Sequence, residues 1–111
     1  MVSGTADGVV MPAAYLGSMR RALQGNTLTV TMGPQIFFTA TIELHSSENP
    51  RAIDYHMTGG PTSGAIQRGI YRISGDTVFF CMAGAGAPRP AEFASKPGDG
   101  RTLSAWVPVR P

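Results

Sequence analysis

The sequence contains a single cysteine, Cys81, so this chain can form neither an internal disulfide nor a cysteine-based zinc site. It has no apolar run near the roughly 18 residues that a membrane-spanning helix requires. Its first residues place no basic segment ahead of an apolar run, so we expect no signal peptide and, by default, a cytoplasmic protein. Apolar residues nevertheless make up 42% of the chain, which excludes a disordered protein.

Charged residues are also few. Nine basic residues stand against seven acidic ones, for a net charge of +2, and Arg20 and Arg21 are the only adjacent bases. Nucleic-acid-binding proteins usually carry a basic stripe with interleaved aromatic residues. The scattered bases of this chain indicate a solvated surface, and we expect neither a nucleic-acid partner nor a membrane partner.

Turn-forming and strand-forming residues dominate what is present. Fourteen glycines and nine prolines punctuate the chain, and the segments between them are short and rich in Val, Ile, Thr, Phe and Tyr. Such a pattern predicts a meander of antiparallel strands. A chain of 111 residues is long enough for one hydrophobic core, so we expect one domain spanning 1–111.

Alternation of apolar and polar residues predicts which face of each strand points to the core. The core-facing residues assigned in this way are Leu28, Val30, Met32, Phe38, Ala40, Ile42, Leu44, Ile53, Tyr55, Met57, Val78, Phe80, Met82, Leu103, Ala105, Val107 and Val109. Segment 65–74 alternates less well, and Gly69 in its middle predicts a bend or bulge that helps to close a barrel.

Two tight hairpins and one short helix complete the predicted elements. Gly25-Asn26 and Gly75-Asp76 each separate two strand-like segments by a two-residue loop. Pro12 favours a turn or two of helix near 12–18, followed by a strand from about residue 19. We therefore predict an all-β fold: a small antiparallel barrel of seven or eight strands, closed or incompletely closed, with one short helix.

Several segments resemble a family of small bacterial lipocalin-like domains of unknown function, which is abundant in planctomycetes. They are Asn49-Pro50-Arg51-Ala52-Ile53-Asp54, Gly69-Ile70-Tyr71, Gly75-Asp76-Thr77-Val78 with Cys81, Arg89-Pro90-Ala91-Glu92-Phe93, Lys96-Pro97-Gly98, and Asp7-Gly8 with Met11-Pro12. The resemblance covers nearly the whole chain, and it implies a calycin-type barrel. It implies no established activity, although lipocalin-like barrels often bind small apolar molecules.

The chain departs from this family at its start. Family members usually begin with a strand that carries a Gly-x-Trp signature, and this sequence starts after the point where that Trp would lie. We therefore expect a short or absent first strand and one poorly covered sheet edge.

Candidate catalytic groups are few. Asp54 and His56 share one face of a strand, and a carboxylate-oriented histidine can act as a base. That face is the predicted solvent side, and no serine or cysteine is tied to it, so we favour a surface pair. Cys81 has no nearby group that would lower its pKa, so we favour a packing role. We expect no enzymatic activity.

Metal ligands are equally dispersed along the chain. His45 and His56 could join Glu43, Glu48 or Asp54, but their spacing matches no compact zinc pattern. We expect no metal and no other cofactor.

Four residues are candidate ligand contacts, namely Tyr55, Tyr71, Arg68 and Met57. The two tyrosines could offer hydroxyl groups to a cavity, or they could be core residues with the hydroxyl at the rim. Arg68 would mark an anion site if it lay inside the barrel, but we favour an outward orientation for it.

Three aromatic residues, Phe37, Phe79 and Trp106, fall on the face opposite the predicted core. An outward aromatic patch of this kind is typical of an interface, so we expect a homodimer. Two functions remain open at this point. One is a non-enzymatic module that binds a small apolar ligand, and the other is a structural protein whose barrel is filled by Phe38, Phe80, Ile42, Met57 and Val107 and which acts through a homodimer or partner interface.

Overall fold

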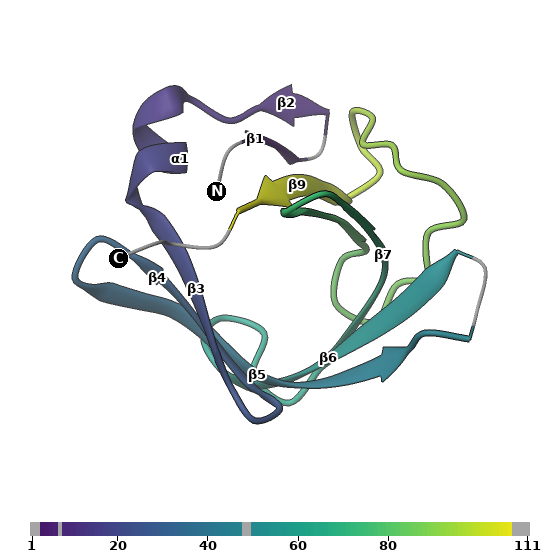
Figure 1. Cartoon of the computed structure of the whole chain (residues 1–111), viewed down its shortest axis with the longest axis horizontal. Helices are drawn as coiled ribbons and strands as arrows, with labels where there is room; N and C mark the ends of the chain where they lie inside the picture. Colours follow the sequence, from purple (N-terminus) through teal and green to yellow (C-terminus); the bar gives the residue numbers. More distant parts are fainter. Residues whose placement is uncertain (1–2, 7, 48–49, 108–111) are drawn as a thin grey trace.

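The structure, a computed structural model, describes residues 3–6, 8–47 and 50–107. Its elements are β1 (Ser3–Ala6), β2 (Val9–Val10), α1 (Ala13–Ser18), β3 (Met19–Gln24), β4 (Thr27–Met32), β5 (Gln35–His45), β6 (Arg51–Gly59), β7 (Ile66–Ser74), β8 (Thr77–Met82) and β9 (Thr102–Trp106). The strands form one sheet in the order β2-β1-β9-β8-β7-β6-β5-β4-β3, and every pair is antiparallel. The sheet curls into an open barrel (Figure 1), which confirms the predicted all-β fold class, although it has nine strands where seven or eight were expected.

In the described part of the chain the barrel is open, because its two end strands do not pair with each other. β2 and β3 are the ends of the strand order, and α1 lies between them along the chain and on that side of the barrel (Figure 1). The helix is tied in on the β3–β4 side, where the Gly33 amide donates to the Ser18 carbonyl oxygen at 2.9 Å. β1 is short, with four residues, yet it pairs with β9 over its whole length.

Both predicted hairpins are confirmed. Gly25 and Gly75 have φ angles of 63° and 62° in the loops β3–β4 and β7–β8, the left-handed conformation that two-residue hairpin loops require and glycine adopts without strain. The expected bulge at Gly69 is wrong, because β7 pairs regularly with β6 and β8 through that position. Gly69 instead allows close packing: an added Cβ would lie 2.8 Å from the Cys81 carbonyl oxygen and 2.9 Å from Met82 Cε.

The register shifts occur in β5 and β6. Val30 pairs with Phe38 and Thr31 pairs with Ile36, so Phe37 is the extra residue in β5. A bulge of this kind changes the direction in which the neighbouring side chains point. Phe37 and Phe38 consequently both reach the interior. Simple alternation would place these two consecutive residues on opposite faces of the strand.

The inner face of the sheet carries the core, as alternation predicts for β4, β6 and β8. The buried core residues there are Leu28, Val30, Ile53, Tyr55, Met57, Phe80 and Met82, and Ala40 joins them from β5, while Phe38, Ile42 and Val78 pack against them. Leu44 was also assigned to the core, but 55% of it is exposed. The reason is that β5 runs on beyond Thr41, where its pairing with β4 ends.

The assignment for β9 is wrong by one residue. Thr102, Ser104 and Trp106 pair with Met82, Phe80 and Val78, and directly opposed residues of antiparallel strands share a face. These three residues therefore face the interior, whereas Leu103 faces outward. Val107 is 41% exposed and does not fill the barrel. Val109 lies outside the described residues, as do Asp7, Glu48 and Asn49.

Residues 83–101, which we call the strap, help to explain why alternation fails for β9. The strap connects β8 to β9 and runs along the outer face of the sheet. It is held by hydrogen bonds from the Ala83 and Gly86 amides to the carbonyl oxygens of Arg68 and Ile66. Cys81, Ile70 and Ala105 on the outer face are consequently buried, with exposed fractions of 0%, 1% and 3%. Both faces of these strands need apolar residues, so polarity no longer distinguishes them.

Candidate functional site

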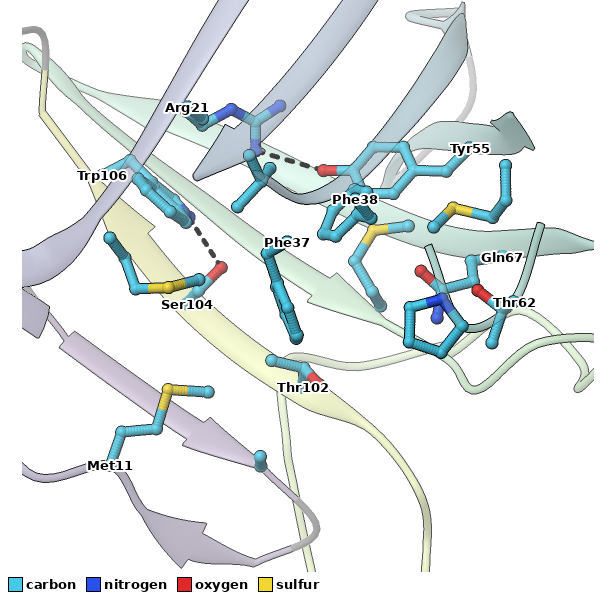
Figure 2. A pocket seen from close by; sticks show the side chains of 16 residues that line it. Met11, Arg21, Phe37, Phe38, Tyr55, Thr62, Gln67, Thr102, Ser104 and Trp106 are labelled. Carbon is cyan, nitrogen blue, oxygen red and sulfur yellow. Dashed lines mark hydrogen bonds between the residues drawn. The ribbon is translucent and has the colours of Figure 1, made fainter. Parts of the chain in front are cut away.

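The interior of the open barrel holds a cavity of about 380 Å³ (Figure 2). Strands β1 and β3 to β9 all contribute side chains to its wall, and the loops after β2 and β6 add Met11, Pro61 and Thr62. The volume is within the range of about 300–1,000 Å³ that small-molecule sites occupy. The side chains of the core therefore do not fill this barrel.

The wall of the cavity is mostly apolar. Half of its 16 lining residues are methionine or aromatic, namely Met11, Met19, Met57, Met82, Phe37, Phe38, Tyr55 and Trp106. Trp106 Nε1 donates a hydrogen bond to Ser104 Oγ at 2.9 Å, so two of the polar groups on β9 satisfy each other (Figure 2). Thioether and aromatic groups adapt to ligands of irregular shape, which suits a site for an apolar molecule.

One charged side chain, that of Arg21, lies among these residues. Arg21 is on β3 opposite Val30, whose side chain is buried in the core. Its guanidinium carbon lies 4.2 Å from the ring centroid of Phe80, 5.6 Å from that of Trp106 and 6.0 Å from that of Tyr55. Its Nη1 donates a hydrogen bond to the Tyr55 hydroxyl at 3.1 Å (Figure 2).

The sequence pattern contained a signal for this arginine that the alternation argument did not use. The two-residue turn at Gly25-Asn26 fixes the register of the β3–β4 hairpin and so places Arg21 opposite Val30. Because Val30 belongs to the core face, Arg21 shares that face. A charge was assumed to belong to the surface, and the inward position was missed.

Two of the four predicted ligand contacts line the cavity, namely Tyr55 and Met57. Tyr71 does not: it is a core residue, 7% exposed, whose ring centroid lies 6.4 Å from that of Phe80. Arg68 does not line the cavity either. Arg68 is the cross-strand neighbour of Asp54 in the β6–β7 register, on the outer face of the sheet. This is the orientation favoured from the sequence.

The three aromatics predicted to form one outward patch do not form one. Trp106 is 8% exposed and lines the cavity, because the register of β9 turns it inward. Phe37 lies at the cavity through the bulge in β5, with 48% of it exposed. Phe79 lies on the outer face, where the Arg72 guanidinium carbon is 4.1 Å from its ring centroid and 5.5 Å from that of Phe93 of the strap. These three aromatics therefore do not support a homodimer, and the homodimer stays a prediction.

The outer face of β5 and β6 brings together four of the five residues considered as metal ligands, Glu43, His45, Asp54 and His56, whereas Glu48 lies outside the described residues. His45 Nε2 lies 3.0 Å from Asp54 Oδ2, and His56 Nε2 lies 3.5 Å from Glu43 Oε2. The ligand atoms of Glu43, His45 and Asp54 all lie within 4.8 Å of one another. Sequence spacing did not reveal this grouping, because it arises from cross-strand pairing of Glu43 with Asp54.

An arginine of the strap already occupies one side of this cluster. Arg89 Nη2 donates to Asp54 Oδ1 at 2.7 Å, and its Nη1 donates to the carbonyl oxygens of Gly69 and Ile53 at 2.8 and 3.1 Å. Burial would raise the pKa of Asp54, but the hydrogen bonds from His45 and Arg89 outweigh it and hold this pKa below its ordinary value. Both carboxylate oxygens are thus engaged, and we interpret the cluster as the anchor of the strap.

Neither Asp54 nor Cys81 is placed for nucleophilic chemistry. The Asp54 carboxylate contacts His45 and Arg89, and its predicted partner on the same strand, His56, contacts Glu43 instead. The Cys81 thiol lies 3.5 Å from the Ala94 carbonyl oxygen, to which it donates, and burial raises the pKa of this thiol. A buried thiol with a raised pKa is a poor nucleophile, which fits its predicted packing role.

These features define an open antiparallel barrel with an internal, largely apolar cavity. No family model, no curated protein and no solved structure matches the chain. No helix among the described residues is long and apolar enough to cross a membrane.

Proposed function

We propose that this protein is a non-enzymatic binding module that holds one small, largely apolar molecule in the cavity of its open barrel. The observation that carries the proposal is the cavity itself, with a volume of about 380 Å³ and a wall of methionine and aromatic side chains. Sites that bury small ligands are usually concave, apolar and supplied with a few polar groups. Lipocalin-like barrels, which the sequence resembles, often bind small apolar molecules, and the proposal agrees with that general property of the fold.

The polar groups of the cavity suit binding better than catalysis. Among the described residues of its wall, Arg21 and Tyr55 are the only titratable side chains. General acid–base chemistry near neutral pH usually uses a histidine, a carboxylate or a lysine within reach of the substrate. Here the histidines, Asp54 and Glu43 lie on the outer face of the sheet instead.

The proposal is tested with N-phenylnaphthylamine, a neutral apolar dye whose emission rises in apolar surroundings. We expect saturable binding of one dye per chain and a higher melting temperature in its presence, because a ligand that binds only the folded state stabilises it. Thr102→Phe adds a ring inside the cavity and should abolish binding. Thr29→Phe makes the same change on the outer face of β4, between the buried residues Leu28 and Val30, and should leave binding intact.

Three results would contradict the proposal. Dye emission that rises linearly without saturation would show non-specific partitioning. An unchanged melting temperature at saturating dye would show that the dye does not stabilise the folded state. Equal binding by Thr102→Phe and wild type would place the dye outside this cavity.

A homodimer is the second candidate, and the exposed end strand β2 favours it. β2 and β3 end the sheet, and Val9 and Val10 of β2 are 68% and 74% exposed. Exposed edges readily pair with another chain, and a two-fold contact would satisfy both copies at once. Sedimentation at micromolar concentration should give twice the chain mass, and a species of the monomer mass across that range would exclude the dimer.

A further inference from the structure

The positive charge inside the cavity narrows the class of ligand, and this inference rests on the proposed function. Arg21 is the only charged side chain among the described residues that line the cavity. Moving a charge away from water is costly unless a partner of opposite charge or several hydrogen bonds compensate it. An apolar ligand alone would supply neither, so the presence of an arginine at this position needs a reason.

The contacts that Arg21 makes within the protein leave much of its binding capacity unused. A guanidinium group has five N–H donors and no acceptor. In the described part of the chain it makes one hydrogen bond, from Nη1 to the Tyr55 hydroxyl, and no carboxylate lies within 4.0 Å of it. The aromatic faces of Phe80 and Trp106 stabilise the cation. They do not accept hydrogen bonds in the plane of the guanidinium, where a carboxylate binds.

We infer that the ligand is an amphiphile with a single negative charge, whose carboxylate binds Arg21 and whose apolar body occupies the methionine- and aromatic-lined part of the cavity. One arginine matches one negative charge, and a planar guanidinium binds a carboxylate through two parallel hydrogen bonds. The Tyr55 hydroxyl accepts the Arg21 bond and can donate its own proton to the same carboxylate. The wall offers no second cation among its described residues, which disfavours a dianion such as a phosphate monoester.

A purely structural role for Arg21 is the competing explanation. In that case the arginine would hold the rings of Phe80, Trp106 and Tyr55 together, and ligand charge would not matter. The two explanations differ in what they predict for a pair of ligands that share one apolar chain. Decanoate and decanol provide this pair, because both are unbranched molecules of ten carbon atoms that differ in the head group.

The experiment measures how well decanoate and decanol displace N-phenylnaphthylamine from the wild-type protein. We expect decanoate to displace the dye at a concentration at least about tenfold lower, because a charge-assisted pair outweighs a neutral hydrogen bond. Arg21→Met removes the charge, keeps an unbranched side chain and should abolish this preference while the dye still binds. Arg20→Met removes the same charge from the neighbouring exposed position and should leave the preference unchanged.

The outcomes separate the inference from the proposed function. Equal displacement by decanoate and decanol in the wild type overturns the inference while dye binding upholds the function. A loss of the preference in Arg20→Met as well as in Arg21→Met overturns it too, since a general surface charge would then be responsible. Absence of saturable dye binding contradicts the proposed function itself. The comparison of decanoate with decanol uses only the wild-type protein, so it still tests the inference if Arg21→Met fails to fold.

Discussion

Replacing Arg89 with methionine should release the strap from the outer face of the sheet. Arg89 donates three hydrogen bonds, to the carbonyl oxygens of Ile53 and Gly69 and to the Asp54 carboxylate. Its side chain is 30% exposed and that of Asp54 is 14% exposed, so solvent screens the ion pair only in part. The strap buries Ile70 and Cys81, which are 1% and 0% exposed.

The expected loss follows from these bonds. A hydrogen bond that involves a charged group contributes about 1.5–3 kcal/mol, and the three share one donor group and are not additive. We therefore expect Arg89→Met to lower the free energy of unfolding by about 2–4 kcal/mol. The matched control is Arg51→Met, which removes an exposed arginine from β6 and should change stability by less than about 0.5 kcal/mol.

Two assays check this expectation. Denaturant unfolding gives the global free energy, and the reaction of Cys81 with a thiol reagent under native conditions reports local opening of the strap. Cys81 is the only cysteine of the chain, so the signal is unambiguous. The thiol should be unreactive in the wild type, unreactive in Arg51→Met and reactive in Arg89→Met. An Arg89→Met protein with wild-type stability and an unreactive thiol would refute the anchoring role of Arg89.

The remaining predictions concern the core and the response to pH. Phe80→Ala should cost about 3–5 kcal/mol in urea unfolding, and a loss below about 1 kcal/mol would contradict the inward register of β8. Gly69→Ala should lower the melting temperature by overpacking against Met82, and a variant as stable as the wild type would contradict the close contact. Because the pKa of Asp54 is lowered by folding, its contribution is present above the ordinary value of 3.8 and is lost as the pH falls through the folded value. The stability difference between the wild type and Asp54→Asn should therefore shrink as the pH falls below about 4, whereas a difference that grows on acidification below that pH would reverse the sign.

The antiparallel meander and the two hairpins were predictable because they depend on local signals. Gly25 and Gly75 mark turns that need a positive φ, and alternation identifies the inner face wherever the outer face meets solvent. The side chains of β9 were assigned to the wrong faces because the strap covers the outer face of this strand and makes Ala105 as buried as Trp106. Alternation cannot assign a face to a strand that is buried on both sides.

The candidate site depended on long-range geometry that the sequence shows only in part. The inward orientation of Tyr55 and Met57 was predictable because β6 alternates cleanly. Phe37 was misplaced because a bulge is a mismatch between two strands and has no signature in one of them. The inward position of Arg21 was missed because its charge was taken to place it on the surface, although the register of the β3–β4 hairpin places it on the inner face.

Energy transfer from Trp106 to bound N-phenylnaphthylamine tests the central claim most directly. Trp106 is the only tryptophan of the chain, and it lines the cavity. A dye in the cavity lies next to the indole, so the account predicts saturable quenching of Trp106 emission, matched by sensitised dye emission, at one dye per chain. Prior addition of decanoate should suppress both signals. Saturable dye binding that leaves Trp106 emission unchanged would contradict the account, because the ligand would then bind away from this cavity.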